Sequence, residues 1–455
     1  MKRYKTFTEV TDNFPYITKL ILKAPQPVRA ECVDKDTFSV YVERIDPTTG
    51  EVLLEQHEWP GERIYPSKGY RPVSAAYPSD ENGRRIYEGD HLTLEFPYEP
   101  TVGLGYTVGT GMLPGGYNAF VDCRYRVTQV KEIPGKIPAS GWVFDECAGD
   151  ICPQLIGWQD SVSHYAPLPL QYGYFTPDLE HAKRAFTALD SNYGDEWPHD
   201  FPEKLPLVIW LHGMGEGATV PRMSYTGNKV VAVSSDNIQR KLGGAAYVLA
   251  PMCPTYWMNS GAENDQDISE LTNEKSMYTE ALKALIDEFL DLHPDIDRDR
   301  VYIGGCSNGG FMTMRMLKSY PDFFAAAYPV CEALRPSDFT EEDIRKLKHL
   351  PMWFTQAEND PIVPPDGLVL PLVRRLKAAG AENVHVSLFE RIVDQSGRAK
   401  LPNGQPMEYM GHFSWIHTFN DDCLYDLDGT RVMHEGRPVT LWRWLGKQRK
   451  KHSDQ

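Results

Sequence analysis

Hydrophobic and polar positions follow two different patterns along the chain, and the change comes near residue 170. Up to about Leu168, short runs of alternating apolar and polar residues are separated by turn signals such as 46–50 and 80–83. The runs 38–43 and 91–96 are of this kind, and no long helical period accompanies them. Short strands at this spacing predict a β-sandwich for the N-terminal part of the chain.

After Tyr172 the apolar runs become continuous and alternate with longer amphipathic stretches. The stretch 274–293 places its apolar residues on one helical face, and 371–379 is a second helix candidate with proline in its first turn. The candidates for buried strands are 205–211, 245–250, 300–305, 349–355 and 384–389. Continuous apolar strands with helical crossovers predict an α/β fold, namely a mostly parallel sheet with helices on both faces.

A proline-containing segment, 161–169, separates the two patterns. At 455 residues the chain is long enough for two domains. We therefore predict an all-β domain over residues 1–165 and an α/β domain over residues 166–455.

The sharpest motif is Gly-Cys-Ser-Asn-Gly at 305–309, which follows the apolar run 301–303 and precedes an amphipathic segment. A strand, a tight turn and a helix are the context in which G-x-S-x-G presents a nucleophilic serine. The turn strains the serine backbone, and side chains at the two ends of the motif would collide, which explains both glycines. Ser307 is therefore the candidate nucleophile, and the Asn308 amide is a candidate oxyanion donor. Cys306 is predicted to point inward as a structural thiol.

A glycine-rich loop at 212–217 follows the first continuous apolar strand. In folds with a serine elbow, a second oxyanion amide comes from the loop after this strand, and by position we select the Met214 N–H. A phosphate-binding loop is the alternative, but the Gly-Lys-Ser/Thr ending and the nucleotide fingerprint are both missing. His212 is interpreted as a packing residue that orders the loop.

A serine nucleophile needs a base, and the base needs an orienting carboxylate, which in this fold follow in the order serine, acid, histidine. After the strand candidate 349–355 we select Asp360 as the acid, with Glu358 as its local alternative. After the last strand candidate we select His412 as the base, with His417 as the second choice.

In these segments the chain resembles the esterase and predicted-peptidase branch of the α/β-hydrolases, close to polyhydroxybutyrate-depolymerase-like and prolyl-oligopeptidase-like enzymes. The resemblance covers roughly residues 170–446 and is carried by 212–213, 305–310, 360–364 and 411–415. The last two segments resemble the family's D-x-x-V-P and G-H-x-S-W motifs. The resemblance implies an α/β-hydrolase fold, and it supports Asp360 and His412 over their alternatives. Some relatives carry an immunoglobulin-like domain, which it implies for the N-terminal part.

One departure from the family pattern is an insert at 394–408, between the last strand candidate and His412. It is predicted to form a β-hairpin or a flap over the site. The shape of the substrate pocket therefore stays open.

The charge and the chain ends limit the expected partners and location. The net charge of -16 opposes binding to nucleic acid and to anionic membranes. No apolar run approaches the roughly 18 residues of a membrane span, and the N-terminus lacks the apolar core of a signal peptide. We expect no nucleic acid or membrane partner and a cytoplasmic location for the chain as given, or secretion if a leader has been removed.

The eight cysteines show no paired CxxC pattern, so free and mostly buried thiols are expected. We expect neither a metal nor a cofactor.

Three functions stay open at this point. The first is a serine hydrolase that cleaves carboxylic esters through an acyl-enzyme. The second is a serine peptidase of the prolyl-oligopeptidase type, which needs an acidic subsite that the sequence does not locate. The third is a non-catalytic binding protein on a hydrolase scaffold. The expected substrate is a small-molecule ester or a short peptide, and the N-terminal domain could also bind carbohydrate or form a homo-oligomer.

Overall fold

The computed structural model divides the chain into two compact units. It describes residues 2–54, 56–57, 64–99, 103–135, 138–189, 200–261, 275–401 and 403–451. Unit 1 consists of Met1–Ile156 and Ser396–Met407, and unit 2 consists of Gly157–Gln395 and Glu408–Gln455. The division thus falls between residues 156 and 157, whereas the sequence placed it between 165 and 166.

In the described residues of unit 1 the regular elements are strands, together with two 3-10 turns, η1 (Ala30–Cys32) and η2 (Pro153–Leu155). Its main sheet pairs β1 and β12 in parallel, and its other neighbouring strands are antiparallel. In spatial order its strands are β6 (Lys68–Arg71), β3 (Phe38–Ile45), β11 (Asp122–Gln129), β12 (Val143–Ile151), β1 (Lys2–Val10), β2 (Pro15–Arg29), β8 (Glu88–Glu95) and β7 (Ala75–Ser79). Two small ribbons, β9 (Val108–Leu113) with β10 (Tyr117–Phe120) and β4 (Gln56–His57) with β5 (Ile64–Tyr65), complete it.

One core lies between the two halves of this sheet, which therefore folds over itself as a sandwich. Alternate residues of β3 are buried, as the pattern at 38–43 predicts, and Val40 and Val42 share their core with Leu92 of β8 from the other half. Phe96 and Tyr125, which also come from different halves, stack with ring centroids 6.2 Å apart. The predicted all-β fold of the N-terminal part is confirmed.

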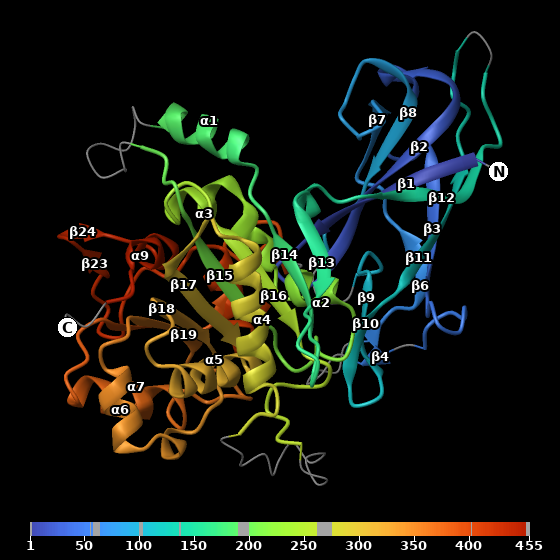
Figure 1. Ribbon diagram of the computed structural model, residues 1–455. Coiled ribbons are helices and arrows are strands. Elements are labelled where there is room, and N and C mark those ends of the chain that lie inside the picture. The colour runs from blue at the N-terminus through green and yellow to red at the C-terminus, as the bar shows by residue number, and fades with distance from the viewer. Residues whose placement is uncertain are drawn as a thin grey trace. The chain divides into compact units, whose positions relative to one another are not determined.

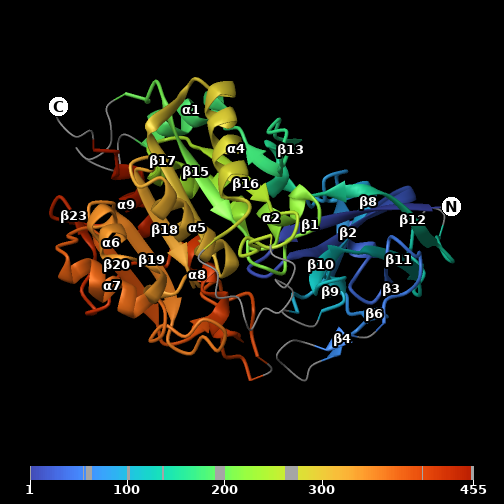
Figure 2. The same ribbon diagram turned by 60° about the horizontal axis from the view of Figure 1, so that its bottom comes forward.

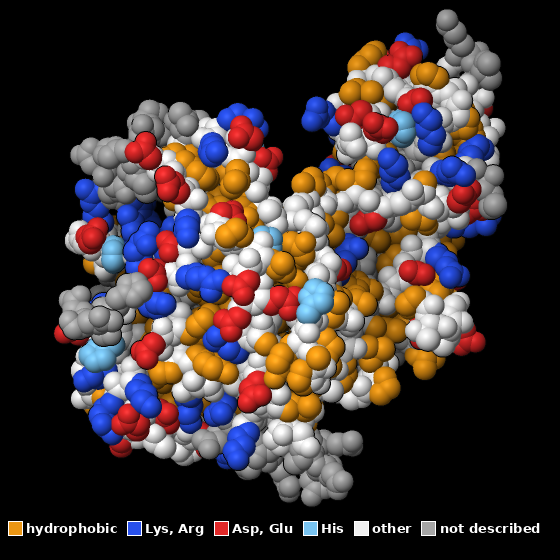
Figure 3. All heavy atoms as spheres, in the orientation of Figure 1, with side chains coloured by type: hydrophobic (Ala, Val, Ile, Leu, Met, Phe, Trp, Pro, Cys, Tyr) orange, Lys and Arg blue, Asp and Glu red, His pale blue; other side chains and the backbone are white. Residues whose placement is uncertain are grey.

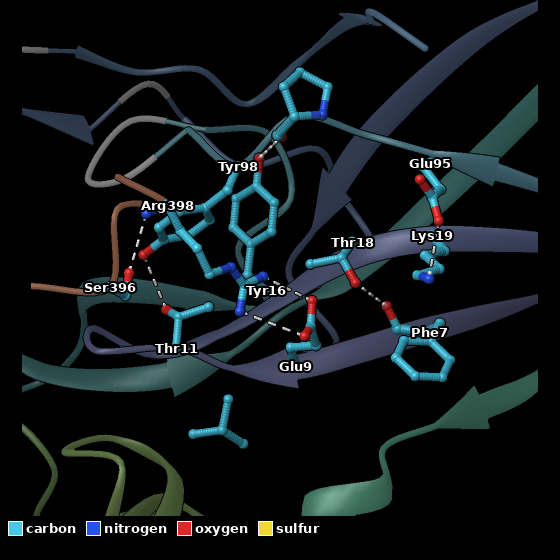
Figure 4. Close-up of polar contacts among 12 residues, drawn as sticks. Phe7, Glu9, Thr11, Tyr16, Thr18, Lys19, Glu95, Tyr98, Ser396 and Arg398 are labelled. Atoms are coloured by element: carbon cyan, nitrogen blue, oxygen red, sulfur yellow. Dashed lines mark hydrogen bonds and ion pairs between the residues drawn. The ribbon is translucent and has the colours of Figure 1, made fainter. Parts of the chain in front are cut away.

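The insert 394–408 is a hairpin whose tip, 396–407, belongs to unit 1 although its flanks belong to unit 2. Arg398 holds Glu9 of β1 through Nη2–Oε2 and Nη1–Oε1 contacts of 2.9 and 3.4 Å, and its guanidinium carbon lies 5.8 Å from the Tyr98 ring centroid (Figure 4). Ala399 and Met407 are buried. The predicted hairpin is therefore present, and its tip is anchored by an ion pair and by apolar burial.

Unit 2 contains the predicted parallel sheet (Figure 1). Strands β15 to β20 run parallel, and β13 and β14 add an antiparallel edge. The spatial order is β13 (Trp158–Val162), β14 (Gln171–Phe175), β16 (Tyr247–Met252), β15 (Leu205–Leu211), β17 (Ile296–Cys306), β18 (Ala326–Val330), β19 (Met352–Ala357) and β20 (Val384–Phe389).

Strand β15 shows why both faces of this sheet carry helices. Its residues are all buried, and Leu207 and Ile209 belong to a core that they share with one group of helices. These helices are α4 (Thr279–Leu292), α5 (Asn308–Ser319), α6 (Glu341–Leu347) and α7 (Val369–Ala378). Trp210 alternates to the opposite face, where its ring centroid lies 4.8 Å from that of Phe419. That face carries α8 (Trp415–Phe419) and α9 (Leu441–Lys447).

Several further helices and small ribbons belong to unit 2. They are α1 (Leu179–Leu189), α2 (Pro221–Thr226), η4 (Val230–Ser234), α3 (Asp236–Lys241), η6 (Pro336–Asp338), η7 (Gly411–Phe413), and the ribbons β21 (Ile392–Val393) with β22 (Glu408–Tyr409) and β23 (Met433–His434) with β24 (Arg437–Pro438). None of the described helices combines the length and the apolar character that a membrane span requires. Acidic and basic side chains are interspersed on the face drawn in Figure 3.

The predicted strands cover most of this sheet but omit the edge strands β13 and β14 and the central strand β18. Residues 326–330 are fully buried, yet they include Pro329, and proline argues against a central strand. The pattern therefore predicts 349–355 as the strand that follows the nucleophile, whereas in the structure β18 lies between β17 and β19. Of the predicted helix 274–293, residue 274 lies outside the described residues, and the helix observed is α4.

Candidate active site

Ser307 sits at a strained bend between the end of β17 and the start of α5. Figure 2 shows these two elements. Its backbone has φ 55° and ψ -115°, a conformation that residues with a side chain rarely adopt. A Cβ at Gly305 would lie 2.5 Å from the Leu211 carbonyl oxygen, and one at Gly309 would lie 1.9 Å from the same atom. The predicted need for glycine at both ends of the motif therefore has a direct steric cause.

The first turn of α5 offers free backbone amides beside the serine. Phe311 N–H donates to the Ser307 carbonyl, so the helical hydrogen bonds begin there. Within the described part of the chain, the Asn308 N–H meets no acceptor, as is usual for the first residue of a helix. The Asn308 side chain is fixed separately, because its Oδ1 accepts from the Trp257 N–H. Cys306 is fully buried, as predicted for a structural thiol.

His212 orients the glycine-rich loop that follows β15. Its Nδ1 lies 2.6 Å from the Gly213 carbonyl oxygen, and its Nε2 accepts from the Cys253 N–H at 3.0 Å. These partners require a neutral ring with the proton on Nδ1, and burial lowers the pKa of His212 to about 4, which keeps it neutral.

The same contact sets the direction of the Met214 amide. In a planar trans peptide the carbonyl and the next N–H point in opposite directions, so holding the Gly213 carbonyl turns the Met214 N–H away from the His212 ring. Among the described residues the Met214 N–H has no acceptor. The loop therefore carries one free, oriented amide at the predicted position.

Asp360 follows β19 and is held by its own loop. Its Oδ1 accepts from the N–H groups of Ile362 and Val363, each at 2.9 Å, and its side chain is fully buried. Glu358, the alternative acid, is exposed. The turn thus aims one carboxylate inward and leaves the other in solvent.

His412 lies in η7 and meets Asp360. Its Nδ1 is 3.0 Å from Asp360 Oδ2 and 3.1 Å from Oδ1, so Nδ1 carries the proton and Nε2 is left as an acceptor. The preceding Gly411 allows this approach, because a Cβ there would lie 2.4 Å from the Asn359 side chain. Two loops that are far apart in sequence therefore meet through one hydrogen-bonded pair.

Cys331 links this pair to the serine bend. The Ser307 N–H donates to the Val330 carbonyl at 3.0 Å, and Cys331 is the next residue. Its thiol and the nearest ligand atoms of Asp360 and His412 lie within 4.8 Å of one another. The structure therefore brings the selected serine, acid and histidine to one edge of the sheet.

This trio of thiol, carboxylate and imidazole has the composition of a metal site, but its chemistry does not favour one. Burial raises the pKa of the Cys331 thiol well above its ordinary value, which disfavours the thiolate that binds metals. His412 Nδ1 and both oxygens of Asp360 already have hydrogen-bond partners.

Both parts of the chain match families of known proteins. Residues 3–136 match the esterase Ig-like N-terminal domain, and residues 201–385 match the phospholipase/carboxylesterase domain. The crystal structure of a thermostable esterase has a TM-score of 0.69 to this chain at 20% identity, and the match covers 98% of this chain and 99% of that one. The chain is an α/β-hydrolase of the esterase branch.

Two curated relatives match parts of this hydrolase. NocK of Nocardia uniformis subsp. tsuyamanensis is 28% identical over 167 residues, which are 37% of this chain and 43% of NocK. Poly(3-hydroxyalkanoate) depolymerase C of Paucimonas lemoignei is 30% identical over 133 residues, which are 29% of each chain. The hydrolase thus spans less than half of the length of either relative that it matches.

His417, the alternative base, and His434, a later histidine, have contacts of their own. His417 Nδ1 is 2.9 Å from Asp422 Oδ2, and its ring stacks on Phe389 with centroids 4.1 Å apart. His434 lies on β23 beside Glu435, at 4.0 Å.

Sequence reasoning missed two buried carboxyl groups and Cys331. Burial raises the pKa of Glu216, in the oxyanion loop, to about 7, and that of Glu332, after β18, to about 8. Cys331 has a φ of 35°, an uncommon conformation for a residue with a side chain. For Glu332 and Cys331 the missing signal was strand β18, which precedes both. For Glu216 the sequence offered no indication of a functional role beyond a charged residue within a glycine-rich loop.

Proposed function

We propose that this hydrolase cleaves carboxylic esters through an acyl-enzyme formed on Ser307. The Ser307 Oγ attacks the ester carbonyl carbon while its proton passes to His412 Nε2. The tetrahedral intermediate then collapses, the bond to the alcohol oxygen breaks, and His412 returns the proton to the leaving alcohol. Water repeats the sequence on the acyl-enzyme and releases the acid.

The other selected groups have supporting roles in this mechanism. Asp360 fixes the orientation and tautomer of His412 and stabilises the imidazolium that forms during the reaction. The N–H groups of Met214 and Asn308 stabilise the negative charge that develops on the carbonyl oxygen.

The observation that carries the proposal is the hydrogen bond between Asp360 and His412. It joins loops from two different strands beside the serine bend, and it leaves Nε2 as the acceptor that general-base catalysis requires. The unpaired amides of Met214 and Asn308 support it independently.

The family match and one relative's name support a proposal for the substrate class. Its domain is described as phospholipase/carboxylesterase, and the depolymerase of Paucimonas lemoignei is named for a polyester. We therefore infer a small ester, or a short ester segment of a longer chain, as the substrate.

The test compares p-nitrophenyl esters with aminoacyl-arylamides, together with labelling by a fluorophosphonate probe. We expect ester cleavage, labelling at Ser307, and loss of both in Ser307→Ala. Faster cleavage of the amides would favour a peptidase. Wild-type activity in Ser307→Ala would refute the proposal.

A further inference from the structure

Glu216 lies on the turn of the oxyanion loop, and its side chain is buried beneath that turn. The Gly217 N–H closes the turn by donating to the Met214 carbonyl at 3.1 Å. Glu216 is only 6% exposed, and within the described part of the chain it forms no ion pair. A carboxyl group buried without a cation is costly unless hydrogen-bond donors surround it.

Three hydrogen-bond donors of the loop or of its support lower the pKa of this carboxyl group and so act against the rise that burial causes. They are the backbone N–H groups of Gly213 and of Glu216 itself, and the Asn228 side chain. A Cβ at Gly213 would lie 3.0 Å from Glu216 Oε2, and one at Gly227 would lie 2.7 Å from its Cγ. The side chain therefore fits into space that two glycines leave open.

Asn228 extends the contact to the nucleophile motif. Its Oδ1 accepts from the Cys306 thiol at 3.6 Å, which leaves its amide nitrogen to face Glu216. A chain of polar contacts thus runs from the residue before Ser307, through Asn228 and Glu216, to the oxyanion loop.

This arrangement engages the N–H groups of Gly213 and Glu216, which precede and follow the Met214–Gly215 pair, and leaves the Met214 N–H free. We propose that Glu216 is a positioning residue, whose carboxylate holds the oxyanion loop in the conformation that presents the Met214 N–H to the substrate. The inference rests on the proposed function, because it concerns the stabilisation of that reaction's oxyanion.

Glu216→Gln should weaken transition-state binding more than substrate binding. A glutamine has one acceptor oxygen and turns an NH₂ group toward donors, so the loop loses part of its support. We expect kcat to fall by about tenfold, which is less than the 10²–10³-fold cost of deleting an oxyanion donor, with KM within about twofold. Binding of a trifluoromethyl ketone, which forms an oxyanion on the serine, should weaken in parallel with kcat.

The pH dependence separates this role from a packing role. Burial raises the pKa of Glu216 to about 7, so its carboxylate should become protonated as the pH falls through neutrality. The ratio of wild-type to Glu216→Gln kcat should therefore be largest above pH 7 and should shrink below it.

Two further variants accompany the measurement. Asn228→Ala removes a donor that lowers the pKa of Glu216, so the acid limb of kcat should move to higher pH. Glu332→Gln alters another buried carboxyl group, which accepts from the Leu334 N–H. The ratio of wild-type kcat to Glu332→Gln kcat should stay near 1 at every pH.

The outcomes separate this inference from the proposed function. Suppose that the wild type cleaves esters and is labelled at Ser307. The inference alone would then be overturned if the ratio of wild-type to Glu216→Gln kcat did not change with pH, or if Glu332→Gln lost as much kcat as Glu216→Gln. A wild type that is not labelled at Ser307 would remove the proposed function beneath it. A pH-dependent ratio, with parallel losses in kcat and in ketone affinity, is the expected result.

Discussion

Two histidine–aspartate pairs lie close together in the sequence of unit 2, and their hydrogen bonds are nearly the same. His412 Nδ1 meets Asp360 Oδ2 at 3.0 Å, and His417 Nδ1 meets Asp422 Oδ2 at 2.9 Å. Both rings are buried. Geometry within the pair therefore does not distinguish a catalytic histidine from a structural one.

The surroundings of the two rings do distinguish them. Asp360 is fixed by two backbone N–H groups, and the pair lies beside Cys331, next to the serine bend. The His417 ring is stacked on Phe389, and its Nε2 is buried without a hydrogen-bond partner in the described chain. The comparison teaches that a base is recognised by what its second nitrogen can reach.

The largest expected effect comes from deleting the two rings in turn. His412→Ala should lower kcat for a p-nitrophenyl ester by roughly 10⁶-fold, because the serine loses its base. The matched variant His417→Ala should stay within about fivefold of the wild type in kcat, because its ring packs on Phe389. Steady-state kinetics on the folded variants measure both values of kcat. Equal losses of kcat in the two variants would contradict the different roles given to the two histidines.

Neutralising the two carboxylates should give the next largest difference. Asp360→Asn should lower kcat by about 10⁴-fold, because an amide favours the wrong tautomer of His412. Asp422→Asn should change kcat only slightly, because its histidine lies outside the proposed site. A near-normal Asp360→Asn enzyme would transfer the acid role to another residue, and Glu358→Gln would then be the next variant to measure.

In thermal stability the two histidine variants should rank in the opposite order from their losses in kcat. His417→Ala removes a fully buried ring and should cost about 3 kcal/mol of unfolding free energy, which corresponds to a lower Tm by roughly 5–10 °C. His412 is 9% exposed and lies in a short 3-10 turn, so His412→Ala should lower Tm by less. Thermal unfolding followed by circular dichroism measures both, and a larger loss in His412→Ala would contradict the structural role given to His417.

Glu332 is a buried carboxyl group that has no histidine partner among the described residues, and it can be compared with the two aspartates that pair with histidines. Burial raises the pKa of Glu332 from 4.5 to about 8, so between these values the native state holds a proton that the unfolded state has released. Its contribution to stability therefore falls as the pH rises through this window. Glu332→Gln does not titrate, so its Tm should gain on the wild type between pH 5 and pH 8, by an amount equivalent to at most a few kcal/mol. A constant Tm difference would show that Glu332 is not buried as a neutral acid.

Much of the fold could be predicted from the sequence because its apolar residues follow a strong periodicity. Strand β15 is a continuous apolar run, and α4 repeats its apolar residues on one face, so both were placed from residue type alone. Strand β18 could not be placed in this way, because Pro329 contradicts the pattern of a central strand. Only the pairing of β18 with β17 shows that a proline is tolerated at this position.

The selected site residues were readable for a different reason. Ser307, Asp360 and His412 follow the chain order that the fold requires, and the resemblance to known motifs chose between neighbouring alternatives. The supporting residues Glu216 and Cys331 were not readable, because their importance depends on burial and on contacts with distant loops. The sharing of the hairpin tip 396–407 with unit 1 is likewise a tertiary property.

The most direct test of the central claim is to trap the acyl group on the protein. Acid quenching of the wild type within one turnover of a p-nitrophenyl ester, followed by peptide mass spectrometry, should show the acyl mass on the peptide that contains Ser307, and Ser307→Ala should not carry it. Rapid ester cleavage with no acyl group on Ser307, or with the group on another residue, would contradict the account.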